Sequence, residues 1–345
     1  MTISRQEREF YRTFSQHGSG EAQVTIEPKE IILLGCILCI DLNLDIPERF
    51  VNSYKPIAMK GFYNISAEEV QLLPDAGEED AVSFLKQIRV FNPSDISYLY
   101  LKVLSELYRR RNKYSRILQT QPFPQIDQIG PRFLLEYGKC NNKLLISWAY
   151  WRKWAFDIDN RSAQETGYLF EPILASCLGG ESLSAKHSVV KRLDEAGNQT
   201  NEGRQVDCYI KDLHEVYELK LRVTIAASGQ GRFKEECSFP REAAAAGMTP
   251  ILVVFDPTPS TLLTQLKKSY AEAGGHSAIG PDAWRLLKEK AGNEMGYFIE
   301  NYIKPPIEEA DSMATDLPDN LMLEVENSAI TIKDASGNNY RITRL

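Results

Sequence analysis

The sequence contains no apolar run long enough to cross a membrane. The longest run, Ile31 to Ile40, has about half of the roughly 20 residues that a spanning helix needs. The N-terminal segment Met1 to Arg8 carries charges, but no apolar stretch follows it, so the pattern of a secretory signal is absent. From these absences we expect a cytoplasmic protein that does not enter a membrane.

Cysteine and histidine are both scarce, with six and four residues. Most of the cysteines lie in apolar runs, and a chain of 345 residues needs no disulfide framework, so we expect reduced thiols. Cys36 and Cys39 have the spacing of a zinc or redox pair, but no second pair exists and their surroundings are apolar. No Ser-His-Asp set, nucleotide P-loop or dinucleotide-binding glycine motif is visible. We therefore expect buried thiols and assign no role to the histidines.

The composition predicts a globular protein with an uneven distribution of charge. Apolar residues make up 43% and charged residues 25% of the chain, and its length suggests about two domains. The net charge is −7, and the segment from Glu300 to Glu326 alone holds eight acidic residues and one basic residue. The remainder is balanced, so a locally basic surface for nucleic acid is compatible with the acidic total.

The patterns along the chain predict three parts. These are a mainly helical N-terminal region over 1–156, a mixed α/β core over 157–305, and an acidic linker with a C-terminal β-hairpin over 306–345. Residues 1–30 are polar and are expected to form a loose arm. The expected elements are helices over 97–119, 144–156, 167–178 and 232–246, strands over 184–193, 205–211, 215–223 and 250–255, and a largely helical stretch over 261–303. The strand 250–255 is apolar throughout, which is typical of a sheet covered by helices on both faces.

Two neighbouring strands carry the most informative charged residues. In the strand 215–223, alternation places Glu218 and Lys220 on one face. Asp207, on the preceding strand, can reach the same face by strand pairing. Charged side chains among apolar neighbours are unfavourable unless they are paired or bound to an ion. A salt-bridge cluster on a solvated strand is the alternative, and the apolar flanks favour a catalytic cluster.

These residue types suit the hydrolysis of a phosphodiester bond. Asp207, Glu218 and the backbone carbonyl of Leu219 offer the hard oxygen ligands that Mg²⁺ takes together with water and a phosphate. Such a cation lowers the pKa of a bound water and neutralises charge on the phosphate. Lys220 would stabilise that charge or help to position and deprotonate the attacking water. Glu171, in the helix 167–178, is a candidate third carboxylate, and a role as a helix N-cap is its alternative.

The order of these residues and elements resembles the PD-(D/E)xK nuclease superfamily. Its hallmark is an acid at the end of one strand and an Asp or Glu-x-Lys sequence on the next, in a mixed sheet flanked by helices. Asp207 matches the first acid, Glu218 and Lys220 match the second element, and Glu171 matches the helical acid that many members carry. Val206 departs from the pattern, because proline often stands there. The resemblance implies a restriction-endonuclease-like α/β core that uses Mg²⁺, with Mn²⁺ as a substitute.

Four stretches look like those of the ApaLI-like group of type II restriction endonucleases. They are Gly167 to Glu171, Gly203 to Asp207, Leu221 to Arg232 and Val253 to Pro259. This resemblance implies a Mg²⁺-dependent homodimer that cuts both strands of duplex DNA at a short palindrome, because a symmetric site needs two symmetric active sites. The namesake of the group reads GTGCAC. Specificity changes easily, so that sequence is a candidate and no more.

Basic and amide residues around this core are the candidate contacts to DNA. The loop from Ser228 to Arg232 could hold a phosphate at a helix N-terminus, or it could be a plain linker. The basic helix around Arg109 could lie on DNA phosphates or form a solvated face. The row Trp148, Trp151 and Trp154 is expected in the core or at a dimer interface. The candidate contacts are Arg204, Gln230, Arg232, Lys234, Arg109, Arg110 and Arg111.

Two other functions are open at this point. One is a nuclease of the same fold without site specificity, acting in repair, recombination or phage defence. The other is a DNA-binding or partner-binding module that keeps the fold and has no chemistry. The presence of Asp207, Glu218 and Lys220 together argues against the second of these.

Overall fold

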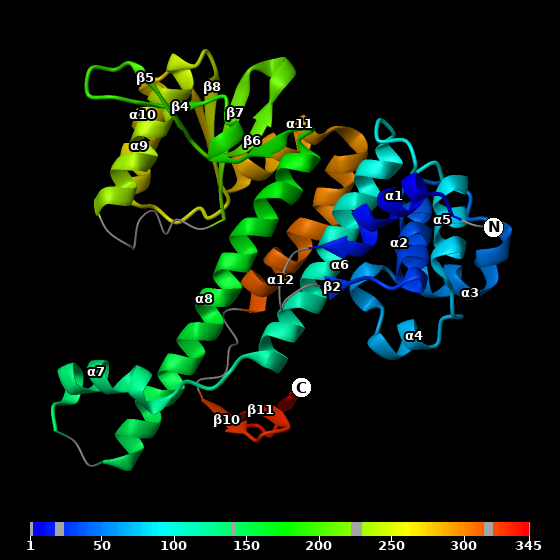
Figure 1. Ribbon diagram of the computed structural model, residues 1–345, viewed down its shortest axis with the longest axis horizontal. Coiled ribbons are helices and arrows are strands. Elements are labelled where there is room, and N and C mark those ends of the chain that lie inside the picture. The colour runs from blue at the N-terminus through cyan, green and yellow to red at the C-terminus, as the bar shows by residue number, and fades with distance from the viewer. Residues whose placement is uncertain (1–2, 18–23, 140–141, 222–229, 314–319, 345) are drawn as a thin grey trace.

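A five-stranded mixed sheet lies at one end of the molecule, and a body of helices packs beside it (Figure 1). The computed structural model describes residues 3–17, 24–139, 142–221, 230–313 and 320–344, without the side chains of residues 17, 111, 163–169, 230–232 and 311. The strand order is β3-β6-β7-β8-β9, with antiparallel pairing up to β7 and parallel pairing from β7 to β9. The predicted class, a mixed sheet flanked by helices, is confirmed.

The elements fall into three groups along the chain. The helical N-terminal part comprises α1 Arg5–Ser15, β1 Gln16–His17, β2 Val24–Thr25, α2 Pro28–Asp41, α3 Glu48–Ala58, η1 Phe62–Asn64, α4 Ala67–Gln71, α5 Glu78–Gln87, α6 Ile96–Thr120 and α7 Ile126–Tyr137. The sheet region comprises α8 Lys143–Cys177, β3 Glu181–Leu183, η2 Ala185–His187, β4 Lys191–Leu193, β5 Gln199–Gly203, β6 Val206–Ile210, η3 Lys211–Leu213, β7 Glu215–Lys220, α9 Gln230–Ala245, β8 Thr249–Val254, α10 Thr261–Glu272, β9 His276–Ile279 and α11 Pro281–Phe298. The remaining elements are η4 Ile299–Ile303, α12 Lys304–Met313, β10 Leu321–Val325, β11 Ala329–Asp334 and β12 Asn339–Thr343.

The two faces of the sheet belong to two different hydrophobic clusters. Side chains alternate along each strand, so Tyr217 and Leu219 of β7 point into the cluster shared with α8, α11 and the N-terminal helices. Val216 and the alternate residues of β8, Leu252 and Val254, point into a cluster shared with α9 and α10. Glu218 and Lys220 alternate with Leu219, so they lie on this second face.

Helix α8 is a single helix of 35 residues where two helices were expected. It crosses residue 157, the predicted boundary between the helical region and the core. Asn142 caps its first turn by accepting a hydrogen bond from the Leu144 backbone N–H at 2.9 Å. The helix ends at Cys177 and is followed by Gly179, whose φ of 72° favours glycine, and by Gly180, where a Cβ would lie 2.5 Å from Cys208 Sγ. This close approach fixes the end of α8 against β6.

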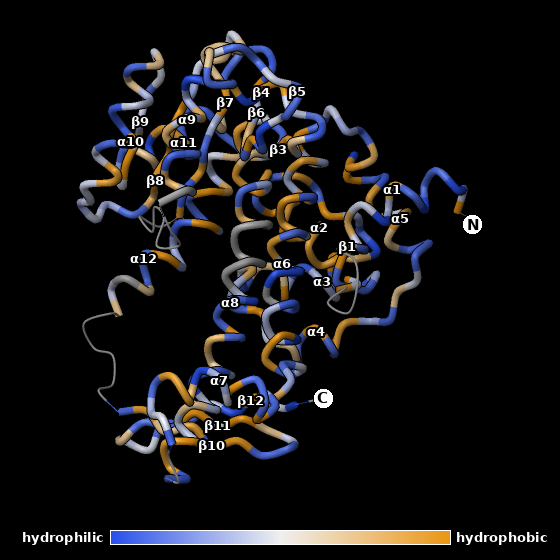
Figure 2. Tube along the Cα trace, turned by 60° about the vertical axis from the view of Figure 1, so that its left-hand side comes forward, coloured by the Kyte–Doolittle hydropathy of each residue, from blue (hydrophilic) through white to orange (hydrophobic). Residues whose placement is uncertain are grey.

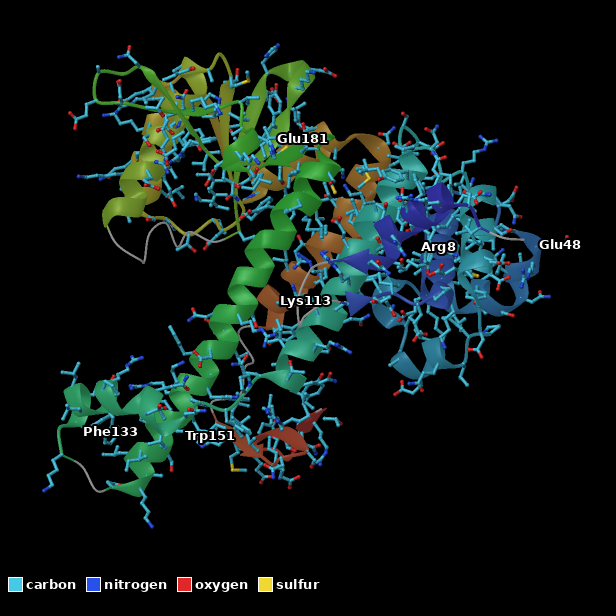
Figure 3. All side chains as sticks on the ribbon, in the orientation of Figure 1. Arg8, Glu48, Lys113, Phe133, Trp151 and Glu181 are labelled. Atoms are coloured by element: carbon cyan, nitrogen blue, oxygen red, sulfur yellow. The ribbon has the colours of Figure 1, made fainter. Side chains whose placement is uncertain are left out.

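The far end of α8 carries α7 and the tryptophan row. Figure 3 places Phe133 and Trp151 at this end and Glu181 at the sheet. Trp154 is buried and packs on Trp151, while Trp148 is exposed. Within this row, the prediction of a core position therefore holds for Trp154 and not for Trp148.

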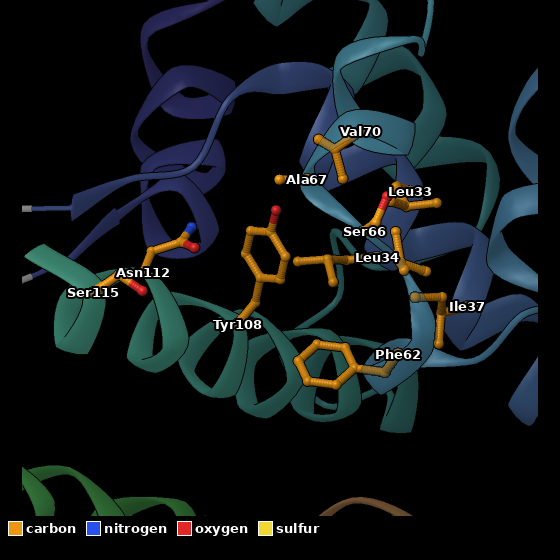
Figure 4. A pocket seen from close by; sticks show the side chains of 11 residues that line it. Leu33, Leu34, Ile37, Phe62, Ser66, Ala67, Val70, Tyr108, Asn112 and Ser115 are labelled. Carbon is orange, nitrogen blue, oxygen red and sulfur yellow. The ribbon is translucent and has the colours of Figure 1, made fainter. Parts of the chain in front are cut away.

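The N-terminal residues pack more closely than a loose arm would. The predicted arm contains α1, whose Tyr11 and Phe14 are buried in the main cluster. These two aromatic residues are three positions apart, so they lie on one face of a helix, and this spacing indicates burial. The polar composition of the segment as a whole masked that pattern. A cavity of about 170 Å³ lies in the same helical body, between α2 and α6, and is lined by Leu34, Phe62 and Tyr108 among others (Figure 4).

The C-terminal strands form a three-stranded antiparallel sheet, one strand more than the predicted hairpin. Figures 1 and 2 show this sheet and α7 at the end of the molecule away from β3–β9. Arg344 attaches the sheet to the helices, because it donates a hydrogen bond to the Gln121 carbonyl at 3.0 Å and lies over the Phe123 ring.

Other expectations were met in part. The expected strand 184–193 is a 3₁₀ turn followed by the short strand β4, and β3 and β9 were not predicted because each has only three or four residues.

Cys140 lies outside the described residues, and the five described cysteines are free thiols. Among the described helices, none has the length and apolar character that a membrane crossing requires.

A half-buried carboxylate joins two N-terminal helices to η4. Asp41 of α2 accepts hydrogen bonds from the Tyr100 hydroxyl of α6 at 2.9 Å and from the Tyr302 hydroxyl of η4. Burial raises the pKa of Asp41, although the tyrosine hydroxyls oppose the rise. The folded protein therefore binds a proton at Asp41 more tightly than the unfolded chain does.

This raised pKa predicts how stability changes with pH. The contribution of Asp41 is complete below its unfolded pKa and is lost as the pH rises through its higher folded pKa. We expect the free energy of unfolding of the wild type, measured relative to Asp41→Asn, to fall between pH 4 and pH 8. Urea unfolding of both proteins across this range measures the difference. A difference that grows with pH would contradict the assignment.

Candidate active site

The antiparallel hairpin β6–β7 brings the three predicted residues together. Cys208 pairs with Tyr217, so the next pair in this register is Asp207 opposite Glu218. The backbone N–H of Leu219 donates a hydrogen bond to Asp207 Oδ2 at 2.9 Å, which holds the carboxylate beside β7. Asp207 is only 7% exposed.

Lys220 is held by two carboxylates. Its Nζ lies 3.1 Å from Glu218 Oε1 and 3.3 Å from Glu236 Oε1. Both Lys220 and Glu236 are largely buried, with side chains 16% and 17% exposed. Burial opposes the charge on Lys220, but Glu218 and Glu236 outweigh it and raise the Lys220 pKa, so the side chain is an ammonium at neutral pH.

Glu236 was missed by the sequence analysis. It lies in α9, one turn before Phe239 and two turns before Ala243, and both of these residues are buried. A carboxylate at this spacing belongs to the apolar face of the helix, where an unpaired charge is unfavourable. A carboxylate on the apolar face of a helix is therefore the sequence feature that could have identified Glu236.

Glu171 approaches the same cluster from α8. Burial raises its pKa to about 7, the charge of Glu218 adds to the rise, and Lys220 opposes it. The N-cap of α8 is Asn142, so Glu171 is an interior residue of this helix and the N-cap interpretation is wrong. The structure thus brings Glu171 near Glu218, as the catalytic interpretation requires.

The carboxylates of the cluster repel one another. Burial raises the pKa of Asp207 well above its usual value, and the charges of Glu218 and Glu171 raise it further. The hydrogen bond from Leu219 and the charge of Lys220 oppose this rise without cancelling it. A nearby divalent cation would favour the ionised carboxylates and remove this unfavourable interaction.

The donor set fits a cation that completes its shell with water and substrate. Within the described ranges, no three acidic, histidine or cysteine side chains form a complete protein metal site. Mg²⁺ is usually bound by one or two carboxylates together with waters and substrate phosphates, so such a cage is not needed. Asp207 and Glu218, on facing positions of two strands, offer this smaller set.

One candidate DNA contact, Arg204, is engaged inside the protein. Arg204 is 11% exposed, and its Nε lies 3.1 Å from Glu242 Oε2, while the Glu242 side chain is 5% exposed. Arg204 also donates a hydrogen bond to the Glu235 carbonyl and lies over the Phe239 ring. Its guanidinium therefore joins the start of β6 to α9, and its burial does not support a contact to DNA.

The basic helix is also partly buried. Arg109 is 6% exposed, and it lies with Arg110 near Glu106. Burial raises the pKa of Glu106, and the charges of Lys102, Arg109 and Arg110 oppose the rise without cancelling it. Burial of Arg109 does not support its predicted place on a DNA-facing surface. Lys234 is exposed on α9. The side chains of the three other candidates lie outside the described residues: Arg111, Gln230 and Arg232.

Comparison with known proteins agrees with the family suggested by the motifs. The family model described as ApaLI-like restriction endonuclease matches residues 62–304. A protein of Acetobacter pasteurianus named Type II restriction enzyme ApaLI is 53% identical over 218 residues, which are 62% of this chain and 57% of that protein. The match thus spans a little over half of the length of this relative. No solved structure matches.

The buried pair Arg204–Glu242 predicts a structural effect of mutation. Arg204→Ala leaves the Glu242 carboxylate buried without its partner, and we expect a loss of about 3–5 kcal/mol in the free energy of unfolding. Arg192→Ala is the control, because Arg192 is more exposed and pairs with the exposed Glu202. Its loss should stay below about 1 kcal/mol. A stable Arg204→Ala protein with weakened DNA binding would instead show that Arg204 contacts DNA.

Proposed function

The chain belongs to the ApaLI-like restriction endonuclease family, and on that premise we propose that it is a site-specific endonuclease that cuts both strands of duplex DNA. The observation that carries this proposal is the cluster of Asp207, Glu218 and Lys220 on one face of β6–β7. This cluster lies inside the matched range 62–304. Its two carboxylates can hold a catalytic cation and its ammonium can stabilise charge on a phosphate, and both suit the hydrolysis of a phosphodiester.

Asp207 and Glu218 would hold Mg²⁺, with the Leu219 carbonyl as a further oxygen ligand and Glu171 as a third carboxylate or the partner of a bound water. Mn²⁺ would substitute, because it also takes oxygen ligands. When bound, the cation supplies a water of lowered pKa and neutralises charge on the phosphate. The mutual repulsion of Asp207, Glu218 and Glu171 supports this assignment, because a bound cation would supply the positive charge that relieves it.

Lys220 would act on the phosphate as a cation. It donates to Glu218 and Glu236, and these carboxylates raise its pKa, so it is a poor acceptor of a proton from water. An ammonium has three N–H donors, and two carboxylates occupy two of them. The third donor is available to a phosphate oxygen, where it would stabilise charge that develops in the transition state.

Cleavage at a palindrome would require two copies of the chain. Each copy contributes one cluster, and a two-fold axis would place one cluster at each strand. The helical N-terminal region 1–156 would then grip DNA and form the dimer, while 157–305 holds the catalytic core. GTGCAC is the first recognition sequence to examine, on the basis of the family resemblance.

The activity is tested by incubation of the protein with a plasmid of known sequence and Mg²⁺, followed by sequencing of the ends. We expect discrete fragments with one shared palindrome at every end. A smear of fragments would indicate a nuclease of the same fold without site specificity. Intact plasmid that is retained by the protein would indicate a module that binds DNA without chemistry.

Mutation of the cluster separates cleavage from binding. We expect Glu218→Ala and Lys220→Ala each to lower the single-turnover cleavage rate by at least about 100-fold, because each removes a group that acts in the transition state. DNA affinity should stay within about threefold of the wild type, since phosphate contacts elsewhere supply most of it.

Glu215→Ala is the matched control for these variants. Glu215 lies on the same strand β7 but pairs with Lys290 at 2.9 Å, away from the cluster. This variant should cut DNA at nearly the wild-type rate. Rapid cleavage by Glu218→Ala or Lys220→Ala would mean that the active site lies elsewhere.

A further inference from the structure

One contact of the cluster is not explained by the roles proposed above. Glu236 of α9 is the second carboxylate at Lys220, and it comes from a helix rather than from β6–β7. Its Oε1 lies 3.3 Å from Lys220 Nζ, and its Oε2 is buried without a hydrogen-bond partner among the described residues. Among the described residues, Lys220 is the one cation that pairs with this carboxylate and offsets the cost of its burial.

The position of α9 makes this contact rigid. Phe239 and Ala243, which follow Glu236 on the same face, are buried in the cluster that covers this side of the sheet. Arg204 holds the same helix through the Glu235 carbonyl and Glu242. Glu236 is therefore presented to Lys220 by a packed helix, not by a loop.

Two fixed acceptors define where an ammonium points. A lysine side chain has four rotatable bonds, and one partner leaves its head free to turn among several rotamers. Glu218 and Glu236 approach Lys220 Nζ from different elements, so two of its three N–H groups have fixed directions. The direction of the third N–H follows from the other two.

We propose that Glu236 is a positioning residue, which holds the Lys220 ammonium from α9 so that its remaining N–H faces the phosphate to be cut. This inference rests on the proposed nuclease function. Glu218 is shared between Lys220 and the cation in that proposal, whereas Glu236 has no other partner within the described chain. Glu236 is thus the contact that keeps Lys220 in place when Glu218 turns towards a cation.

The test is Glu236→Gln, which keeps the size of the side chain and removes its charge. We expect the single-turnover rate at saturating DNA to fall by about 10- to 100-fold, as for groups that orient a catalytic side chain. The dissociation constant for DNA, measured with Ca²⁺ in place of Mg²⁺, should change less than threefold. Circular dichroism and thermal unfolding check that the variant is folded.

Glu235→Gln is the matched control, because it makes the same change of charge one residue earlier. Glu235 is exposed, and its carboxylate lies 3.5 Å and 3.8 Å from Arg192 and Arg204, away from Lys220. We expect this variant to cut DNA at nearly the wild-type rate. Glu236→Asp is a second variant that retains the charge and shortens the reach, and its rate should fall between those of the wild type and Glu236→Gln.

Three results would overturn the proposal. Glu236→Gln that cuts as fast as Glu235→Gln would show that Lys220 needs no second anchor. A loss of DNA affinity equal to the loss of rate would assign Glu236 to binding. A Mg²⁺ requirement raised more than tenfold, with an unchanged maximal rate, would assign it to the cation. Failure of the nuclease proposal is distinct from these, because the wild type itself would then leave DNA intact.

Discussion

The arrangement of this protein depends on the repulsion among carboxylates gathered on one partly buried face of a sheet. Asp207 and Glu171 both have raised pKa values because they are buried near Glu218. One ammonium, Lys220, is the only cation that the described residues place in contact with this set. Such a cluster is unfavourable for folding alone, which is why we infer that it serves a bound cation and a phosphate.

The fold positions this cluster by covering the two faces of the sheet differently. Leu219 and Tyr217 pack against α8, α11 and the N-terminal helices, and this packing fixes β7 on the face opposite Glu218 and Lys220. The opposite face carries Glu218 and Lys220 and is covered by α9 and α10. The end of α8 is pressed against β6 at Gly180, and this contact sets the place from which Glu171 reaches the cluster.

Short-range patterns in the sequence predicted much of this arrangement. Alternation in β7 was sufficient to place Glu218 and Lys220 on one face, and pairing with the preceding strand brought Asp207 to that face, because strand geometry has a fixed period. Glu236 and the pair Arg204–Glu242 could not be predicted in this way, since they depend on how α9 packs across the sheet. The continuity of α8 was missed because the sequence pattern changes after residue 157, which suggested a break between the helices 144–156 and 167–178, whereas one helix runs through both ranges. Strands as short as β3 and β9 carry too few residues for a periodic signal.

The most direct test of this account is anomalous diffraction from crystals of the protein grown or soaked with Mn²⁺. We predict a single strong peak, or two neighbouring peaks, within about 2–3 Å of the Asp207 and Glu218 carboxylate oxygens and beside Lys220 Nζ. A cation bound elsewhere, with these carboxylates left without one, would contradict the central claim that their repulsion marks a metal-dependent active site.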